Sequence, residues 1–300
     1  MSRKPLVSII MNCYNSDQYL KQSIDSALHQ TYENIEIIFW DNQSTDLSPT
    51  IVNAYNDKRI KYFYSNDHTP LAEARNAAIQ KSSGEYIAFL DCDDLWNKDK
   101  LKISFEKLNG SDKRKNIAVI YSRSLVIDGN GNLLHKNQKS PSGDIHDTLL
   151  MYGNFIIFSS VIIKRSVLSE CGGIDENLNY CEDLSLILNA LKGNPAIGVD
   201  QLLVSYRLHA NNLTKLKEFE NNLEVVNFLT SYVRKNKING VVRYNVILQN
   251  SYRLTSCFVK NFVNLNISNC IYIIKNHTNM LLLFPLWIFN KAFISIFKKL

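Results

Sequence analysis

Strand-like and helix-like segments alternate through the first ninety residues, and this alternation constrains the fold more than any other feature of the sequence. Short apolar strand patterns are predicted at 6–11, 35–40, 60–64 and 85–90. Helical patterns lie between them at 17–29, 48–56 and 70–81. Because strands separated by helices usually pair in parallel, the sequence predicts an α/β fold.

Polar residues follow three of these predicted strands, at 12–15, 41–46 and 91–94. The carboxyl ends of parallel strands meet at one edge of a sheet, and ligands of open α/β sheets gather there. We therefore expect the three polar segments to converge on one binding site.

The third polar segment carries three carboxylates, Asp91, Asp93 and Asp94, directly after a buried strand. Crowded carboxylates repel one another and are costly to desolvate, and a divalent cation removes both penalties. Mg²⁺ and Mn²⁺ take oxygen ligands, and a Mg²⁺ site usually combines one or two carboxylates with substrate phosphates. The segment predicts a metal site and a phosphorylated substrate. The alternative is a solvated loop in which Asp93 or Asp94 caps the next helix.

The middle of the chain mixes strand patterns at 117–121, 159–163 and 198–206 with a helix at 182–191. Beyond Asn211 the sequence becomes helical, basic and rich in asparagine. We expect a domain boundary near Thr214.

Composition restricts the partners of this chain of 300 residues. Its net charge of +6 suits anionic ligands or an acidic membrane surface, and no interleaved basic and aromatic patch predicts a nucleic-acid partner. The six cysteines contain no Cys-x-x-Cys pair, which indicates free thiols in a reducing compartment. The first strand starts without a preceding leader, so we expect a cytoplasmic protein.

A strongly apolar run covers 280–289 and is interrupted by Asn290 and Lys291. It falls short of the ~20 residues that a spanning helix needs. Two interpretations remain open for 280–300: an interfacial helix anchored by Trp287 at a membrane surface, or a hydrophobic helix that covers the core or a partner.

Several motifs, in order and over residues 5–212, resemble the inverting family 2 glycosyltransferases. They are the opening strand with its Tyr-Asn turn at 7–15, the loop 40–46, the Ala-Arg-Asn helix at 71–78, the DxD motif at 91–94, the Glu-Asp motif at 180–183 and the closing segment 206–212. The resemblance implies a GT-A fold, which is a Rossmann-like α/β fold with a mixed central sheet, here with a C-terminal helical extension. It also implies a catalytic domain at 1–213, with nucleotide-sugar binding in 1–110 and the acceptor side in 111–213, followed by a helical region at 214–300.

The resemblance also implies roles for individual residues. Asp183, with Glu182 beside it, corresponds to the catalytic base, and Asp91, Asp93 and Asp94 would hold Mn²⁺ or Mg²⁺. The donor nucleotide would be bound by Asn12, Tyr14, Asn15, Asp41, Asn42, Arg75, Asp91, Cys92, Asp93 and His209. At Asn42 the sequence departs from the family pattern, which has an acid there, but an amide can still hydrogen-bond a uracil edge.

The implied function is transfer of a sugar from a nucleotide-sugar, with a UDP-sugar favoured, to a hydroxyl of a glycan or lipid-linked glycan in bacterial surface polysaccharide synthesis. The protein would work at the inner face of the cytoplasmic membrane, with 280–300 as a membrane contact. Two alternatives are a catalytically degenerate GT-A-like assembly subunit and a phosphatase of the haloacid dehalogenase type. The phosphatase pattern matches 89–93 but leaves Arg75 and Asp183 without a role.

Overall fold

The computed structural model describes residues 4–111, 117–137 and 140–281, and the chain divides into two compact units. Unit 1 comprises Met1–His146 and Asn154–Asn212, and unit 2 comprises Asp147–Gly153 and Leu213–Leu300. Residues 147–153, which the sequence analysis placed on the acceptor side of the first domain, lie in unit 2. The functional division at 213 stays a prediction.

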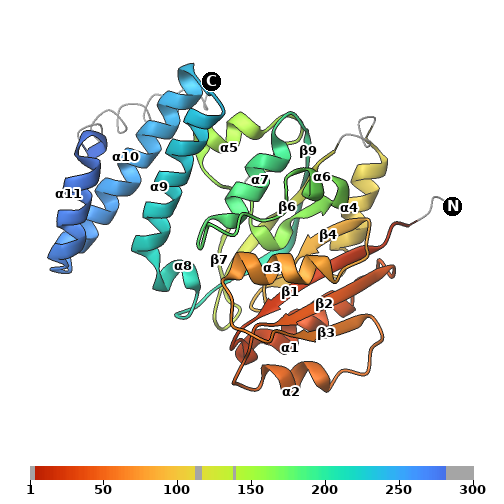
Figure 1. Ribbon diagram of the computed structural model, residues 1–300. Helices are drawn as coiled ribbons and strands as arrows, with labels where there is room; N and C mark the ends of the chain where they lie inside the picture. The colour runs from red at the N-terminus through yellow and green to blue at the C-terminus, as the bar shows by residue number, and fades with distance from the viewer. Residues whose placement is uncertain (1–3, 112–116, 138–139, 282–300) are drawn as a thin grey trace. The chain divides into compact units, whose positions relative to one another are not determined.

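Four parallel strands form one half of the sheet of unit 1, in the order β3-β2-β1-β4 (Figure 1). They are β1 (Val7–Cys13), β2 (Ile35–Asp41), β3 (Ile60–Tyr64) and β4 (Tyr86–Phe89). Strands β1 and β4 are buried over nearly their whole length, as is usual for parallel strands covered on both faces.

The other half makes the sheet mixed, as the resemblance implied. Strand β8 (Ile162–Lys164) runs antiparallel to β4 and to β6 (Val119–Asp128), and β6 pairs in parallel with β9 (Ala196–Leu208). The short strands β5 (Leu95–Trp96) and β7 (Leu133–Lys136) pair antiparallel with β9 and β6.

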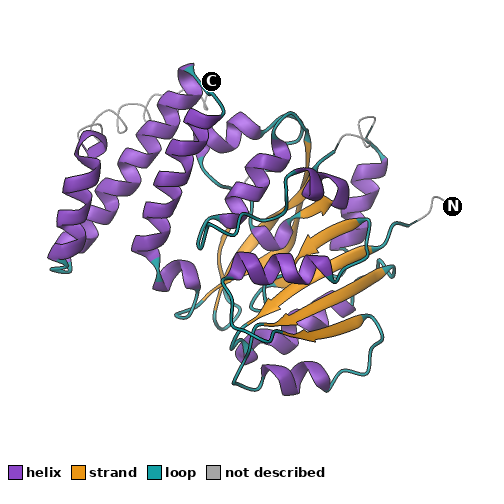
Figure 2. Cartoon of the chain, in the orientation of Figure 1, coloured by secondary structure: helices purple, strands orange, loops and turns teal. Residues whose placement is uncertain are grey.

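Helices flank this sheet, as Figure 2 shows. The chain moves from β1 through α1 (Asp17–Leu28) to β2, and through α2 (Ser48–Asn53) to β3, and then reverses direction through α3 (Leu71–Gln80) to β4. Because such crossovers are right-handed, the reversal puts α3 on the face opposite to α1 and α2. Helix α3 packs on β1 and β2.

The later helices of unit 1 are α4 (Lys100–Asn109), α6 (Arg165–Glu170) and α7 (Glu182–Leu191). Helix α4 packs against β6 and β9, and its apolar residues join a core shared with β1, β2, β4 and α1. The predicted bounds of β3 and α7 agree with the structure. Helices α4 and α6 and strands β5 and β7 were not predicted, because short elements carry few periods of a hydrophobic pattern.

Unit 2 is helical. It contains α8 (Leu213–Leu216), α9 (Glu218–Lys235), α10 (Gly240–Val263) and α11 (Ile267–Leu281), together with most of α5 (His146–Tyr152). Helix α10 packs against both α9 and α11 around a small core that includes Val226, Leu254 and Ile273. Among the described helices, none has the length and hydropathy to cross a membrane. The predicted membrane contact at 280–300 lies, apart from Met280 and Leu281, outside the described residues.

Candidate active site

The three predicted polar segments meet where the order of the parallel strands changes direction, between β1 and β4. The backbone N–H of Asn42 donates to the carbonyl of Cys13 over 2.8 Å, and that of Leu90 donates to the carbonyl of Ile10 over 3.0 Å. The Cys92 thiol donates to the carbonyl of Asn12 over 3.2 Å. Such a switch point is the usual ligand site of an open α/β sheet.

Arg75 of α3 connects two acidic segments that are far apart in the sequence. Its Nη1 donates to Oε1 of Glu182 over 2.5 Å, and its Nη2 donates to Oδ1 of Asp91 over 2.9 Å. The guanidinium lies over the ring of Phe158, 4.5 Å from the centroid. Arg75 is 6% exposed and the Glu182 side chain 5%, so their contact is shielded from water, whereas the Asp91 side chain is 40% exposed. The two charge-assisted contacts together hold the start of α7 to the end of β4.

Asn76, the next residue of α3, holds the loop that leads to α7. Its Nδ2 donates to the carbonyl of Ile174 over 2.8 Å, and its Oδ1 accepts from the Ile174 N–H over 3.0 Å. Gly173 has a φ of +83°, and a Cβ there would lie only 3.0 Å from Oδ1 of Asn76. Neighbouring residues of one helix therefore position both the Glu-Asp pair and the loop before it.

Asp183 lies in the first turn of α7, beside this bridge. Burial and then the charge of Glu182 raise its pKa to about 7, and Arg75 opposes the shift. Its Oδ1 accepts a hydrogen bond from the N–H of Leu184 over 2.6 Å. A carboxyl with a pKa near neutrality suits a general base that must accept and release protons near pH 7.

Asp93 is held by the segment that closes unit 1. Its Oδ2 lies 2.9 Å from Nε2 of His209 and accepts from Nδ2 of Asn212 over 3.2 Å. The Asn211 N–H donates to Nδ1 of His209, so the neutral imidazole carries its proton on Nε2 and donates it to Asp93. Burial and the nearby Asp91 charge raise the pKa of Asp93, and His209 partly offsets this.

Asp94 has a different environment from the other two acids of the segment. Its side chain is fully buried, Oδ2 accepts from the Ser159 hydroxyl over 2.5 Å, and Oδ1 accepts from the Arg207 N–H over 2.9 Å. Burial, followed by the charges of Asp93 and Asp91, raises the pKa of Asp94 well above its usual range. Both oxygens are already used, so the geometry does not support Asp94 as a metal ligand and favours a structural role.

Arg207 fixes the backbone beneath Asp93. Its Nε donates to the Asp93 carbonyl over 2.9 Å, its Nη2 donates to Gln22 over 2.8 Å, and its guanidinium lies 4.3 Å from the centroid of Tyr19. Arg207 is 2% exposed. Arg207 therefore holds the backbone of Asp93 in place and is itself buried.

Asp41 and Asn42 lie at the end of β2 and in the loop after it, and both side chains form hydrogen bonds within the protein. Asp41 is fully buried and accepts from the Ser44 N–H and the Tyr62 hydroxyl, each over 2.8 Å. The Asn42 amide donates to the Thr69 carbonyl over 2.8 Å and accepts from the Thr69 N–H over 3.2 Å. One of its two N–H groups and its oxygen are engaged, and Asn42 is 5% exposed, so the geometry favours a structural role for this side chain over reading a base edge.

Exposed rings lie beside this loop. Tyr14 is 51% exposed, and its ring centroid lies 4.2 Å from that of His68. Nδ1 of His68 lies 2.9 Å from the Asn42 carbonyl, and because a carbonyl only accepts, this nitrogen carries the proton. The two rings are tilted by 44°, so a planar base can stack on the exposed face of either one. His68 was absent from the sequence prediction.

The remaining predicted donor residues lie close to these. Asn15 has a φ of +49°, and its Oδ1 accepts from the Thr45 N–H over 2.8 Å. Nδ2 of Asn12 is buried and has no hydrogen-bond partner within the described part of the chain. Cys92 is buried in the core, so its place in the donor site rests on the family resemblance.

No three His, Cys, Asp or Glu side chains of the described residues are arranged as a ready metal site. Asp91 and Asp93 nevertheless fit a site that a bound diphosphate would complete. One oxygen of each is engaged, by Arg75 and by His209 with Asn212. The second oxygen of each accepts no hydrogen bond within the described residues, and two carboxylates with substrate phosphates are a usual Mg²⁺ ligand set.

The structural neighbours of Asp91 and Asp94 could not be predicted from local sequence. Ser159 accepts from the Asp91 N–H over 3.2 Å, donates to Asp94, and receives the Trp96 indole N–H on its carbonyl over 2.7 Å. Phe158 lies next to it under Arg75. Neither residue belongs to a recognisable motif, and only the pairing of β8 with β4 brings them to the site.

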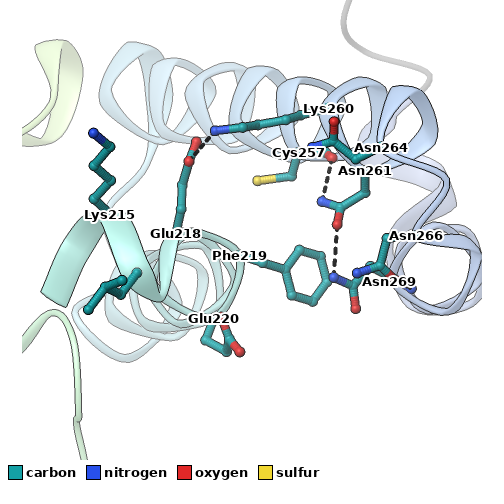
Figure 3. A pocket seen from close by; sticks show the side chains of 11 residues that line it. Lys215, Glu218, Phe219, Glu220, Cys257, Lys260, Asn261, Asn264, Asn266 and Asn269 are labelled. Atoms are coloured by element: carbon teal, nitrogen blue, oxygen red, sulfur yellow. Dashed lines mark hydrogen bonds and ion pairs between the residues drawn. The ribbon is translucent and has the colours of Figure 1, made fainter. Parts of the chain in front are cut away.

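Unit 2 contains a separate pocket of about 290 Å³, drawn in Figure 3. Its lining is mainly polar, and Glu218 forms an ion pair with Lys260 across it. None of the predicted site residues lies there. We assign the chemistry to the carboxylates and Arg75 of unit 1, because a catalytic site is defined by its reactive groups and not by its volume.

The family model described as glycosyl transferase family 2 matches residues 8–172. An uncharacterized glycosyltransferase of Rickettsia bellii is 33% identical over 78% of this chain and 33% of its own length. The Escherichia coli protein WfaP, named a UDP-Glc:alpha-D-GlcNAc-diphosphoundecaprenol beta-1,3-glucosyltransferase, is 34% identical over 71% of this chain and 82% of its own.

Two solved structures share the fold at low sequence identity. Staphylococcus aureus TarS 1-349 in complex with UDP-GlcNAc has a TM-score of 0.60 and 17% identity, over 84% of this chain and 80% of that one. The mannosyltransferase PcManGT of Pyrobaculum calidifontis, in complex with GDP-Man and Mn²⁺, has a TM-score of 0.63 and 15% identity, over 100% of this chain and 89% of that one. These likenesses agree with the GT-A fold that the sequence predicted.

Proposed function

Because the chain belongs to glycosyl transferase family 2, we propose that it is an inverting enzyme that moves a sugar from a UDP-sugar to a hydroxyl of a glycan or lipid-linked glycan. The names of WfaP and of a second Escherichia coli relative, WfgD, support this donor and this acceptor class, since both specify UDP-Glc and a diphosphoundecaprenol acceptor. The role would lie in bacterial surface polysaccharide synthesis, at the inner face of the cytoplasmic membrane. Membership of the family leaves the phosphatase alternative without support.

One observation carries the proposal: the buried guanidinium of Arg75 joins Asp91 to Glu182. The bridge brings the end of β4, where the diphosphate would bind, next to the start of α7, where the base would act. A donor and an acceptor bound at these two places would meet in one reaction site, which lowers the entropic cost of their encounter.

Asp183 would take the proton of the acceptor hydroxyl. The acceptor oxygen then attacks the anomeric carbon from the side opposite the nucleoside diphosphate, and the carbon–oxygen bond to the diphosphate breaks with its electron pair on the leaving group. Attack from the opposite side inverts the anomeric configuration. Glu182 would act as a positioning residue, because its carboxylate is bound to Arg75 and is 4% exposed.

Asp91 and Asp93 are the residues that would hold Mn²⁺ or Mg²⁺ together with the donor. When bound, such an ion supplies positive charge that stabilises the departing diphosphate. His209 and Asn212 orient the Asp93 carboxylate for this task through their contacts to Oδ2. The base would stack on the exposed face of Tyr14 or His68.

Calorimetric binding of UDP, GDP, CDP and dTDP, with and without Mn²⁺, tests the donor site. We expect one nucleotide to bind selectively, in a Mn²⁺-dependent manner, and the Asp91→Ala/Asp93→Ala variant to lose this binding. The Asp144→Ala variant is the matched control, because Asp144 is an exposed acid away from the motifs. If no nucleotide binds, the degenerate assembly subunit becomes the better interpretation.

The stereochemical claim needs a separate measurement on the active enzyme. Proton NMR of the first product formed from an α-linked UDP-sugar should show a β-glycoside. An α-linked product would rule out the single displacement by Asp183 even if the donor site is correct.

A further inference from the structure

The turn between α10 and α11 exposes a group of large apolar side chains. We propose that this turn, here called the hairpin tip and defined by Phe262, Val263, Leu265 and Ile267, docks unit 2 on an anionic lipid bilayer. The proposal concerns a surface of unit 2 alone and stands independently of the donor, acceptor and stereochemistry proposed above.

The four residues of the hairpin tip lie within six positions of the chain, 262–267, and are strongly exposed. Phe262 is 59% exposed, Val263 72%, Leu265 81% and Ile267 51%. The exposure continues along α11 at Ile271 and Ile274, which share one stripe with Ile267 by their spacing of four and three residues. Clustered exposed apolar residues of this kind mark an interaction surface, whereas single ones do not.

Leu265 occupies its exposed position at a conformational cost. Its φ is +57°, in the left-handed region that normally follows a helix with glycine. The turn has the usual closing bonds of such a helix end, from the Asn266 N–H to the Asn261 carbonyl over 2.8 Å and from the Leu265 N–H to the Phe262 carbonyl. Glycine would make the same turn without strain. Because Leu265 is strained there and contributes little to the core, we infer that its side chain serves in binding.

The excess of positive charge in this part of the chain favours an anionic partner. From residue 213 to the end the sequence contains twelve Lys and Arg residues against three Glu, whereas residues 1–212 contain 22 Lys and Arg against 25 Asp and Glu. No acidic residue follows Glu224. Lys275 lies on α11 and is exposed, whereas Lys260 of α10 forms an ion pair with Glu218. A basic helical surface with exposed apolar residues is suited to an anionic membrane interface.

A second copy of this chain is a poorer occupant, because two such surfaces would bring like charges together. A membrane-spanning role for the hairpin is also unsupported, since no described helix is long and apolar enough to cross a membrane. The inferred contact therefore lies in the plane of the lipid headgroups. It differs from the contact that the sequence analysis expected, which was at 280–300.

Flotation of the full-length protein with vesicles tests the inference. We expect binding to vesicles that contain phosphatidylglycerol and much weaker binding to pure phosphatidylcholine. The Phe262→Ser/Leu265→Ser variant should bind about tenfold or more weakly, because two large apolar side chains leave the interface. The control is Leu133→Ser/Leu134→Ser in β7 of unit 1, where both leucines are 53% exposed, and its binding should not change.

A second variant, Trp287→Ser/Phe289→Ser, separates the hairpin tip from the C-terminal segment. The inference is overturned if the hairpin-tip variant binds like the native protein, or if only the C-terminal variant loses binding. Equal binding to neutral and anionic vesicles would also overturn it. Sedimentation velocity without lipid tests whether the partner is a second copy of the chain. If the native protein self-associates and the hairpin-tip variant does not, the partner is a second copy and the inference is overturned. Thermal unfolding of each variant verifies that the fold is intact.

Discussion

Two ionisable side chains have pKa values that burial shifts toward neutrality, and each makes the stability of the protein depend on pH. Asp183 has its pKa raised to about 7 in unit 1, mainly by burial. Lys100 has its pKa lowered to about 7, also by burial, and lies 3.9 Å from the centroid of Trp96. Nζ of Lys100 has no hydrogen-bond partner within the described residues. Both groups lose stabilising hydration in the folded state, but with opposite dependence on pH.

For Asp183→Asn we expect kcat to fall about 10²- to 10⁴-fold while the protein becomes more stable above pH 7. The folded-state pKa of the carboxyl lies above its unfolded value, so the native protein loses stability as pH rises from about 4 to about 7. The amide avoids this penalty, which we put at about 1–3 kcal/mol. Denaturant unfolding at pH 4 and pH 8, together with initial rates, measures both effects.

The exposed Asp144→Asn change serves as the control and should alter neither stability nor rate. In the native enzyme, activity should also decline as pH falls through about 7, because the base becomes protonated. A variant at Asp183 that keeps its activity would exclude the residue as the base.

For Lys100→Met we expect a gain in the free energy of unfolding at or below pH 7, on the order of 3 kcal/mol. Here the folded-state pKa is below the unfolded value, so the native protein carries the full penalty at low pH and loses it as pH rises from about 7 toward 10. The advantage of the variant should shrink over that range. Chemical unfolding at pH 6 and pH 9.5 measures this change in the stability difference between Lys100→Met and the native protein. The exposed Lys102→Met variant on the same helix is the reference.

At the scale of elements, helix ends determine both the site and the hairpin tip. Helix α7 begins at the Glu-Asp pair, and α3 carries Arg75 in its middle, so one helix start and one helix face define the proposed reaction site. Two other helices end with a non-glycine residue in the left-handed region: Lys237 after α9 with a φ of +53°, and Leu265 after α10. These ends store strain that glycine would relieve.

Leu265→Gly and Lys237→Gly should each stabilise unit 2 by about 1 kcal/mol, because glycine adopts the left-handed region without steric cost. The same Leu265→Gly variant should bind anionic vesicles more weakly. Thermal unfolding followed by circular dichroism measures the first effect, and flotation measures the second. If Leu265→Gly destabilised the protein, the leucine side chain would have to contribute packing, and the argument from strain would fail.

At the scale of the whole molecule, the chain consists of two compact units with separate cores. All predicted donor and catalytic residues lie in unit 1, and the excess of positive charge lies in the sequence that forms most of unit 2. This separation predicts that a ligand of one unit need not alter the local stability of the other.

Hydrogen exchange with saturating UDP and Mn²⁺ should therefore slow in α3, in the segment that joins β4 to β5 and at the start of α7, while α10 stays unchanged. At a ligand concentration of about 100 times Kd the expected stabilisation is about 2.7 kcal/mol. The Asp91→Ala/Asp93→Ala variant should show no protection. Equal slowing in α10 would show that the units are coupled.

The sequence alone predicted the alternating α/β architecture, the convergence of three polar segments and the family, because these depend on periodicity and on motifs whose residues are close in the chain. It could not predict that Asp94 is used by Ser159 and Arg207, or that the Asn42 amide is used by Thr69, because these partners are distant in sequence. Whether a carboxylate faces a ligand or the core depends on which side chains the folded sheet brings beside it. Only tertiary packing decides that, since burial and hydrogen bonding compete for the same oxygen atoms.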